Sequence, residues 1–334
     1  MAAVLFYFRG ARHYLTVLVL LLLTPVYFSG NFIGDVANSY IYSINAPSEA
    51  GFEIGFVWLI EWLKQLGLHD ESLMYFIQFL CGFLHVCVFI LWRREKTPLL
   101  FAATFAMLTV SFFLATQNVI RQGISSAMIA IAIHFWWYGA PIIISILFAI
   151  IAQVIHSSSV AFIATITFCC FIFEYAEKRY LRNLKKSKLF FLVILYIALT
   201  ILICLLIQKL WGEYLLTASR NNERFLGIEK VLIIGFVFFV TQILWSRRNA
   251  DLMTQRLFFL RATFLAVFIS LSMDLLFIEV ASRILFFYFV IEALCALRML
   301  SSLSHPLQLL GAIFLVIVYG VSLNVLALLE QHLI

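Results

Sequence analysis

Apolar runs of close to 20 residues, separated by short polar or charged stretches, follow one another along most of the chain. An α-helix rises about 1.5 Å per residue, so such a run is long enough to cross a hydrocarbon core about 30 Å thick. The pattern therefore predicts about eleven transmembrane helices. Their expected ranges are 13–29, 73–92, 97–116, 121–138, 140–156, 157–175, 188–210, 229–246, 256–275, 283–300 and 306–328.

The composition agrees with a membrane environment. Hydrophobic residues make up 64% of the chain and charged residues 12%, whereas soluble domains have about 25% charged residues. The fold class is therefore expected to be all-α and polytopic. Because no polar stretch is long enough for a second domain, residues 1–334 are expected to form a single membrane domain. The six cysteines lie inside apolar runs, so we expect neither a disulfide nor a metal site.

The distribution of charge predicts how the chain is oriented. With the N-terminus in the cytoplasm, 16 of the 23 lysines and arginines fall at cytoplasmic helix ends, as the positive-inside rule requires. The same loops account for the net charge of +6 without a nucleic-acid partner. Most acidic residues lie on the opposite side, where two longer outer loops are expected at about 30–72 and 211–228.

The first outer loop contains an amphipathic segment. Its apolar face consists of Phe56, Leu59, Ile60 and Leu63. Trp58 and Trp62 flank this face, and tryptophan is typical of the headgroup level of a membrane. We therefore expect an interfacial helix in this loop.

Two polar residues mark the ends of a predicted helical hairpin. With a turn near Gly139, Arg121 lies 18 residues before the turn and His156 lies 17 residues after it. Both are then about 26 Å from the turn, at one membrane face. Ionisable residues at the edge of an apolar medium are costly and are candidates for function. Two plainer interpretations stay open: a snorkelling interface arginine, and a helix-end histidine bonded to a carbonyl.

Further charged residues fall near the same face. Arg220 and Arg224 lie in the second outer loop, among amides that could equally be turn residues. Arg283 follows Glu279 by four positions, so these two residues could simply pair with each other. Glu292 lies inside a predicted span, where we expect it to be protonated or paired with an unidentified partner.

Several common chemistries lack their motifs. The sequence has no glycine-rich phosphate loop, no zinc-protease helix and no Gly-x-Ser-x-Gly elbow. Acid–base catalysis and electrostatic stabilisation by arginines remain. Arginines at an outer membrane interface suit a lipid-linked phosphate, which a guanidinium can bind with two hydrogen bonds.

Four short motifs resemble the EpsG-type branch of the Wzy oligosaccharide polymerases. They are Asn118-x-x-Arg121-Gln122 with His156-Ser-Ser about 34 residues later, Gly34-Asp35 with Tyr40, Phe52-Glu53-x-Gly55-Phe56, and Ala281-Ser-Arg283-Ile-x-x-Phe-Tyr288-Phe. In the first outer loop the chain departs from the pattern, because no arginine precedes Gly34-Asp35.

The resemblance implies a multi-pass glycosyltransferase of the bacterial inner membrane with a periplasmic active face. It would move a growing glycan from undecaprenyl diphosphate onto the non-reducing end of a lipid-linked repeat unit of O-antigen, capsule or exopolysaccharide. The implied partners are the lipid-linked oligosaccharide, membrane lipids, a chain-length regulator and a repeat-unit flippase. Neither a cofactor, a metal nor a nucleotide sugar is expected.

Our hypothesis for the site divides the outer residues into three roles. The proton of the acceptor hydroxyl is expected to go to His156 or Asp35. The residues expected to bind the diphosphate are Arg121, Gln122, Arg283, Arg220 and Arg224. The residues expected to bind the acceptor sugar are Asn118, Tyr40 and Glu53.

Two other functions remain as alternatives. A flippase for the same lipid-linked sugar would be expected to show internal repeats and polar residues near the membrane midplane, and this sequence has no convincing repeat. A ligase acting on finished glycans would be expected to have one large outer loop, whereas this chain divides its outer polar surface between two. A lipid-translocation assay distinguishes a flippase from a polymerase. The glycan products of a mutant distinguish a ligase from a polymerase.

Overall fold

All the secondary structure that the structure describes is helical. The computed structural model describes residues 40, 43–48, 52–95, 97–117, 120–157, 159, 163, 166, 251–272 and 278–301. No strand occurs in these ranges, so the all-α expectation is confirmed for them. The predicted helices 13–29, 188–210, 229–246 and 306–328 lie outside the described residues, as does most of 157–175.

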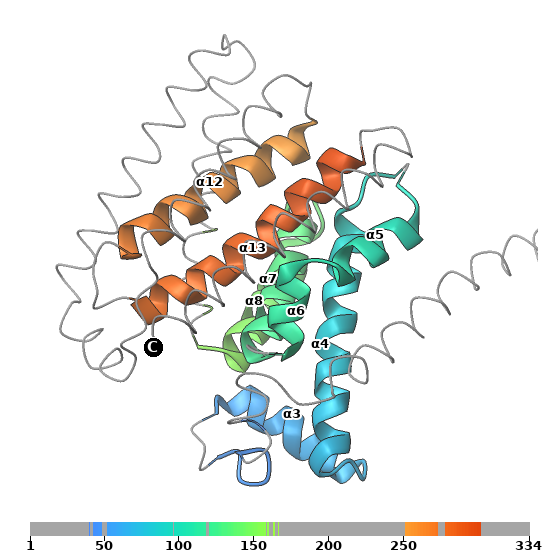
Figure 1. Cartoon of the computed structure of the whole chain (residues 1–334), viewed down its shortest axis with the longest axis vertical. Helices are drawn as coiled ribbons and strands as arrows, with labels where there is room; N and C mark the ends of the chain where they lie inside the picture. Colours follow the sequence, from blue (N-terminus) through green and yellow to red (C-terminus); the bar gives the residue numbers. More distant parts are fainter. Residues whose placement is uncertain are drawn as a thin grey trace, which may run out of the picture. The chain divides into compact units, whose positions relative to one another are not determined.

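The chain divides into two compact units. One comprises Met1–Val160 and Ala296–Val316, and the other comprises Ala161–Cys295 and Ile317–Ile334. The first unit holds α3 (Ile54–Gln65), α4 (Asp70–Trp92), α5 (Leu99–Met107), α6 (Val110–Gln117), α7 (Ile120–Trp137) and α8 (Ile142–Ile155) (Figure 1). The second holds α12 (Leu252–Ser272) and most of α13 (Ile278–Leu300), whose last turn belongs to the first unit.

Helix α4 forms the centre of the first unit, where it packs against α5, α6 and α7. Gly123 of α7 lies close to two neighbouring helices, since a Cβ there would lie 2.7 Å from Cys81 Sγ of α4 and 2.8 Å from Ala115 Cβ of α6. At the other end of the interface, the Trp92 indole N–H donates to the Ala130 carbonyl at 3.1 Å. Small residues allow helices to approach closely in membranes, where van der Waals packing drives their association.

The predicted hairpin is present. Helices α7 and α8 pack against each other and are joined by a turn in which Gly139 has φ +75°, a left-handed conformation that glycine adopts without strain. Pro141 precedes the first residue of α8, where its fixed φ suits a helix start. The helices end within a few residues of the predicted ranges 121–138 and 140–156.

The predicted span 97–116 is wrong as a single helix. It is divided into α5 and α6 at Leu108 and Thr109. The Thr109 hydroxyl accepts the Phe112 N–H at 3.3 Å and donates to the Ala106 carbonyl at 2.6 Å. It thus caps the start of α6. Because a single threonine does not interrupt the apolar pattern, hydrophobic periodicity did not predict the break between α5 and α6.

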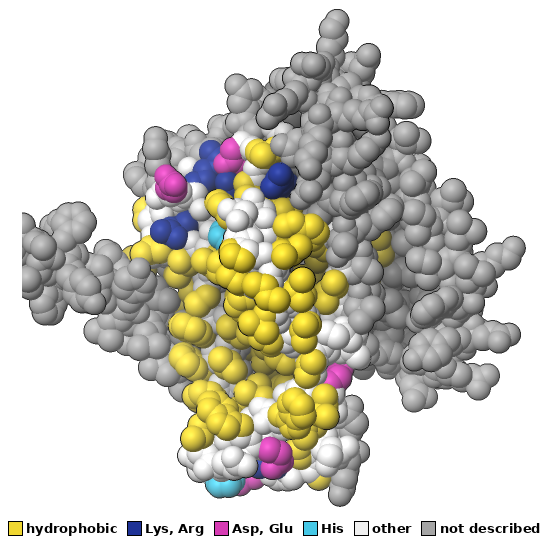
Figure 2. Space-filling model, turned by 180° about the vertical axis from the view of Figure 1, so that it is seen from behind, with side chains coloured by type: hydrophobic (Ala, Val, Ile, Leu, Met, Phe, Trp, Pro, Cys, Tyr) yellow, Lys and Arg dark blue, Asp and Glu magenta, His cyan; other side chains and the backbone are white. Residues whose placement is uncertain are grey.

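The outer surface of the first unit is strongly apolar. Figure 2 shows a band of hydrophobic side chains between charged groups at its two ends. The exposed residues of α8 are Ile142, Ile143, Ile146, Leu147 and Ile150. Among the described helices, α4 is the one long and apolar enough to cross a membrane, while α8 is apolar but has only 14 residues. The total of about eleven spans stays a prediction.

Helix α3 has the two faces that the sequence predicts. Phe56, Ile60 and Leu63 are fully buried, whereas Trp58 and Trp62 are 62% and 55% exposed. The buried face packs mainly on α8. This contact brings the start of α3 to the C-terminal end of the hairpin.

Candidate functional site

Glu53 is placed at the end of the hairpin by a close helix contact. It immediately precedes α3 as the N-cap residue, with an extended backbone (φ −62°, ψ 147°). Two residues later, a Cβ on Gly55 would lie 2.5 Å from Val154 Cγ1 and 2.8 Å from the Val154 carbonyl oxygen of α8. The absence of a side chain at Gly55 therefore lets the backbone of α3 lie directly on the last turn of α8, beside His156.

Arg121, the second residue of α7, forms an ion pair with Glu53 through its Nη1. Its Nε donates to the Tyr40 hydroxyl at 3.0 Å. The guanidinium also lies over two rings, with Cζ 4.7 Å from the Phe52 centroid and 5.8 Å from that of Tyr40. A cation in the first turn of a helix faces the positive end of the helix dipole, so the carboxylate and the aromatic faces offset that cost.

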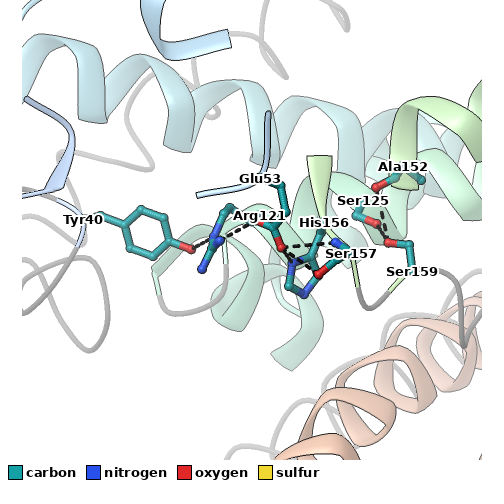
Figure 3. A network of polar contacts seen from close by, with 8 residues as sticks. All are labelled: Tyr40, Glu53, Arg121, Ser125, Ala152, His156, Ser157 and Ser159. Carbon is teal, nitrogen blue, oxygen red and sulfur yellow. Dashed lines mark hydrogen bonds and ion pairs between the residues drawn. The ribbon is translucent and has the colours of Figure 1, made fainter. Parts of the chain in front are cut away.

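His156 binds the other oxygen of the same carboxylate. It follows the last residue of α8 with an extended backbone, and its N–H donates to the Ala152 carbonyl at 3.0 Å. Its Nδ1 lies 2.9 Å from Glu53 Oε1. Ser157 donates to the same oxygen from its N–H at 3.1 Å and from its hydroxyl at 3.2 Å. Figure 3 shows these side chains in one row, from Tyr40 to Ser157.

The surroundings of Glu53 keep its carboxylate ionised. Burial by itself would raise the pKa of this group, but the hydrogen bond from His156, the charge of Arg121 and the N–H of Ser157 together hold the pKa well below its usual range. An ionised carboxylate only accepts hydrogen bonds. His156 Nδ1 must therefore carry a hydrogen atom and donate a hydrogen bond to Glu53.

Two nitrogen atoms of this cluster have no protein partner among the described residues. No hydrogen bond from Arg121 Nη2 reaches this part of the chain. His156 Nε2 is buried and likewise accepts no hydrogen bond from a described group. Arg121 Nη2 and His156 Nε2 thus remain without a partner among the described residues. A buried polar atom without a partner, such as His156 Nε2, is a candidate for function.

A second polar contact supports the back of the site. The hydroxyls of Ser125 in α7 and Ser159 are hydrogen-bonded, and Ser159 Oγ also donates to the Ala152 carbonyl at 3.3 Å. These buried serines link the chain after His156 to both arms of the hairpin (Figure 3).

The structure brings four of the predicted site residues together: Tyr40, Glu53, Arg121 and His156. Gln122 is buried beside Arg121. Arg283 lies in the second turn of α13, within the second unit, and its side chain is not described. The remaining predicted residues, Asp35, Asn118, Arg220 and Arg224, lie outside the described residues.

Two members of the cluster were not predicted individually. Phe52 lies under the guanidinium, and Ser157 donates twice to Glu53. The serines that follow the helix-ending histidine were a usable signal, because a serine hydroxyl can donate a hydrogen bond to a carboxylate. Within the described ranges, no group of three His, Cys, Asp or Glu side chains could hold a metal ion.

The plainer interpretations of the two hairpin residues do not describe this geometry. Arg121 is paired with a carboxylate instead of extending alone to a membrane surface. The ring of His156 binds the same carboxylate instead of a helix-end carbonyl.

Comparison with known proteins agrees with the motifs. Searches of curated proteins and of solved structures return no match. A family model, that of the EpsG family, matches residues 12–332, which is nearly the whole chain. This family consists of membrane-associated, polysaccharide polymerase-like proteins. The chain therefore belongs to the EpsG family.

Proposed function

We propose that this protein is a bacterial inner-membrane glycosyltransferase that polymerises lipid-linked oligosaccharide repeat units. In each cycle the growing glycan moves from undecaprenyl diphosphate onto the non-reducing end of a new lipid-linked unit at the periplasmic face. Family membership supports a polymerase-like activity. The observation that carries the proposal is the meeting of Arg121 and His156 on one carboxylate.

Arg121 is the group proposed to bind the leaving diphosphate. Its Nε and Nη1 are held by Tyr40 and Glu53, so the planar guanidinium is fixed before substrate arrives. Nη2 is left to donate to a phosphate oxygen. A prearranged cation stabilises the charge that develops on the diphosphate as the glycosidic bond breaks. Arg283, Arg220 and Arg224 are proposed to add further positive charge.

His156 is proposed as the base that accepts the proton of the acceptor hydroxyl. Its Nε2 carries the free lone pair when Nδ1 donates to Glu53. Asp35 is the other candidate base. The donor is already activated by its diphosphate, so no nucleotide sugar is needed.

The test is complementation of a strain that lacks its own polymerase, with each variant expressed at the wild-type level. We expect Arg121→Ala and His156→Ala to abolish long-chain polysaccharide on gels, leaving single repeat units. Glu61→Gln is the control, because Glu61 is 50% exposed on α3 and is not part of the cluster. Long ladders from both site variants would contradict the site assignment.

A reconstituted assay tests the reaction itself. The purified full chain in proteoliposomes should convert the lipid-linked repeat unit into polymer with release of undecaprenyl diphosphate. Translocation of the lipid-linked unit without polymer would instead indicate a flippase. Transfer of a finished glycan onto a different acceptor would indicate a ligase.

A further inference from the structure

Both oxygens of Glu53 are already occupied by protein groups. Oε2 binds Arg121, and Oε1 accepts three hydrogen bonds, from His156 Nδ1, the Ser157 N–H and the Ser157 hydroxyl. A carboxylate oxygen with three donors has little capacity left for a sugar hydroxyl. Its contacts therefore point to a role in arranging its neighbours.

His85 provides an internal comparison. Its Nδ1 lies 3.2 Å from the Cys81 carbonyl of its own helix, and its Nε2 is also buried without a partner among the described residues. An unpartnered Nε2 alone is thus no sign of a site. What distinguishes His156 is that its Nδ1 binds a charged carboxylate, which also holds an arginine.

The fold around His156 leaves the ring few orientations. Its backbone is bonded to Ala152, and the ring is 7% exposed. The described charged and titratable groups around the ring are Glu53 before α3, Arg121 in α7 and, beyond it, Tyr40. Of these, Glu53 alone is an ionised acceptor within hydrogen-bond distance of Nδ1.

We infer that Glu53 is the positioning residue of the active site, because it holds His156 in the tautomer whose Nε2 accepts the acceptor proton and holds Arg121 beside it. This inference rests on the proposed function. One carboxylate then sets both the direction of the base and the place of the diphosphate-binding cation, so the two act on the same glycosidic bond.

The chemical step balances without another reactant. The acceptor hydroxyl oxygen bonds to the anomeric carbon of the growing glycan, and its proton passes to His156 Nε2. The bond from that carbon to the diphosphate breaks, and its electron pair goes to the diphosphate oxygen beside Arg121. Glu53 keeps its negative charge and stabilises the imidazolium. The proton then leaves to solvent or to the released diphosphate.

Glu53 is itself a poor candidate for the base. The surroundings that keep its pKa well below its usual range make the carboxylate a weak proton acceptor. A weakly basic carboxylate that accepts an N–H from histidine is suited to orienting the ring.

The kinetic experiment compares Glu53→Gln with Glu61→Gln in the full chain, with the lipid-linked repeat unit as substrate. Glutamine keeps the size of the side chain but removes its charge, and Glu61 lies exposed on α3, the helix that Glu53 precedes. We expect kcat of Glu53→Gln to fall about 10²- to 10⁴-fold, the range of general acid–base catalysis, with a much smaller change in KM. Glu53→Asp should recover part of the loss, and Glu61→Gln should resemble wild type. An unchanged kcat in Glu53→Gln, with His156→Ala inactive, would overturn the inference and leave the proposed function standing.

A spectroscopic experiment tests the inference without relying on activity. Histidine labelled with ¹⁵N in the wild-type full chain gives separate signals for protonated and unprotonated ring nitrogens, and His156→Gln identifies the signal of His156 among the seven histidines. We expect the neutral ring to carry its proton on Nδ1 in the wild type, and a shift towards the tautomer protonated on Nε2 in Glu53→Gln. A neutral wild-type ring with its proton on Nε2 would overturn the inference. Because this measurement needs no polymerisation, a failure of the proposed function would be seen separately, as an absence of polymer from the wild type.

Discussion

Two arginine–glutamate pairs in this protein have the same chemistry and different surroundings. Arg121–Glu53, in the first unit, has side chains 24% and 18% exposed, and its carboxylate is shared with His156 and Ser157. Arg261–Glu292, in the second unit, joins α12 to α13 with side chains only 1% and 4% exposed. Partial exposure leaves the first pair accessible to a ligand, whereas complete burial makes the second a closed contact between helices.

The contacts around the buried pair support a structural role. Tyr288, one turn before Glu292 on α13, is also fully buried. The Arg261 guanidinium lies 5.6 Å from the Phe258 ring centroid. Charges in an apolar interior require full pairing, and removal of one partner leaves the other uncompensated. The same residue types therefore form a closed structural contact in one unit and part of the candidate site in the other.

The largest effect is expected at the buried pair. Arg261→Met should destabilise the protein by about 3–5 kcal/mol, because Glu292 is left buried without its partner. The double variant Arg261→Met with Glu292→Leu should regain most of this loss. Heating the purified protein before size-exclusion chromatography measures both. A single variant as stable as wild type would contradict a structural role for this pair.

At the site, the effect should appear in activity. Arg121→Lys keeps the charge but loses the planar arrangement of donors between Tyr40 and Glu53. We expect polymerisation to fall about 10²-fold, as when one prearranged donor is removed from a transition state. Thermal stability, measured in parallel, should change less than in Arg261→Met. The reverse pattern, with full activity and lost stability, would assign Arg121 to the fold.

Gly55→Ala tests whether the helix contact positions the site. The new Cβ would meet Val154 at 2.5 Å and its carbonyl oxygen at 2.8 Å, so α3 must move away from α8. Overpacking of this kind costs about 1–3 kcal/mol. Since Glu53 lies two residues earlier, activity should fall as well. Gly67→Ala is a contrasting control, because Gly67 has open space around its Cβ position and its positive φ gives a backbone cost without a clash.

The pH dependence of stability gives a smaller signal. The folded-state pKa of Glu53 is lowered, so its ionised form contributes stability above the ordinary pKa of about 4.3, and this contribution is lost as the pH falls towards the folded-state value. The stability difference between wild type and Glu53→Gln should therefore shrink as the pH is lowered below about 5, and should go on shrinking as the pH approaches the folded-state value. Melting curves at several pH values measure this. A constant difference would show that the charge of Glu53 is not what stabilises the cluster.

The exposed Glu61–Lys64 pair should show the smallest effect. Its side chains are 50% and 20% exposed and lie three residues apart on α3. Pairs of this kind contribute about 0.3–0.5 kcal/mol. Glu61→Gln and Lys64→Gln should thus keep both stability and polymer length, as measured by the same melting curves and gels. A large loss of polymer would extend the site along α3.

Periodicity and charge predicted the helical fold and the hairpin, because both are recorded in the local order of apolar residues. The turn at Gly139 and the ends of α7 and α8 could therefore be placed closely. The break at Thr109 was missed because a side-chain cap depends on one hydroxyl. Likewise, the partner of Glu292 could not be identified from the sequence, because Arg261 is 31 residues away and no local pattern records their pairing.

The site itself was only partly predictable. Arg121 and His156 could be placed at a common level because both lie on one hairpin of known rise. The role of Glu53 as their shared partner depends on how α3 packs on α8, and the sequence shows that contact only as a glycine. The ionised state of the Glu53 carboxylate follows from that packing.

The geometry of the candidate site depends on the number of residues in α7 and α8 more than on which apolar residues these helices contain. The arms contain 18 and 14 residues, and apolar substitutions on their exposed faces leave the distance from Gly139 to Arg121 and His156 unchanged. One residue added to α8 would turn His156 by about 100° around the helix axis and shift it about 1.5 Å, away from Glu53. Every side chain of the candidate site would still be present. Insertions and deletions within the arms are therefore expected to be excluded even where substitutions are freely accepted.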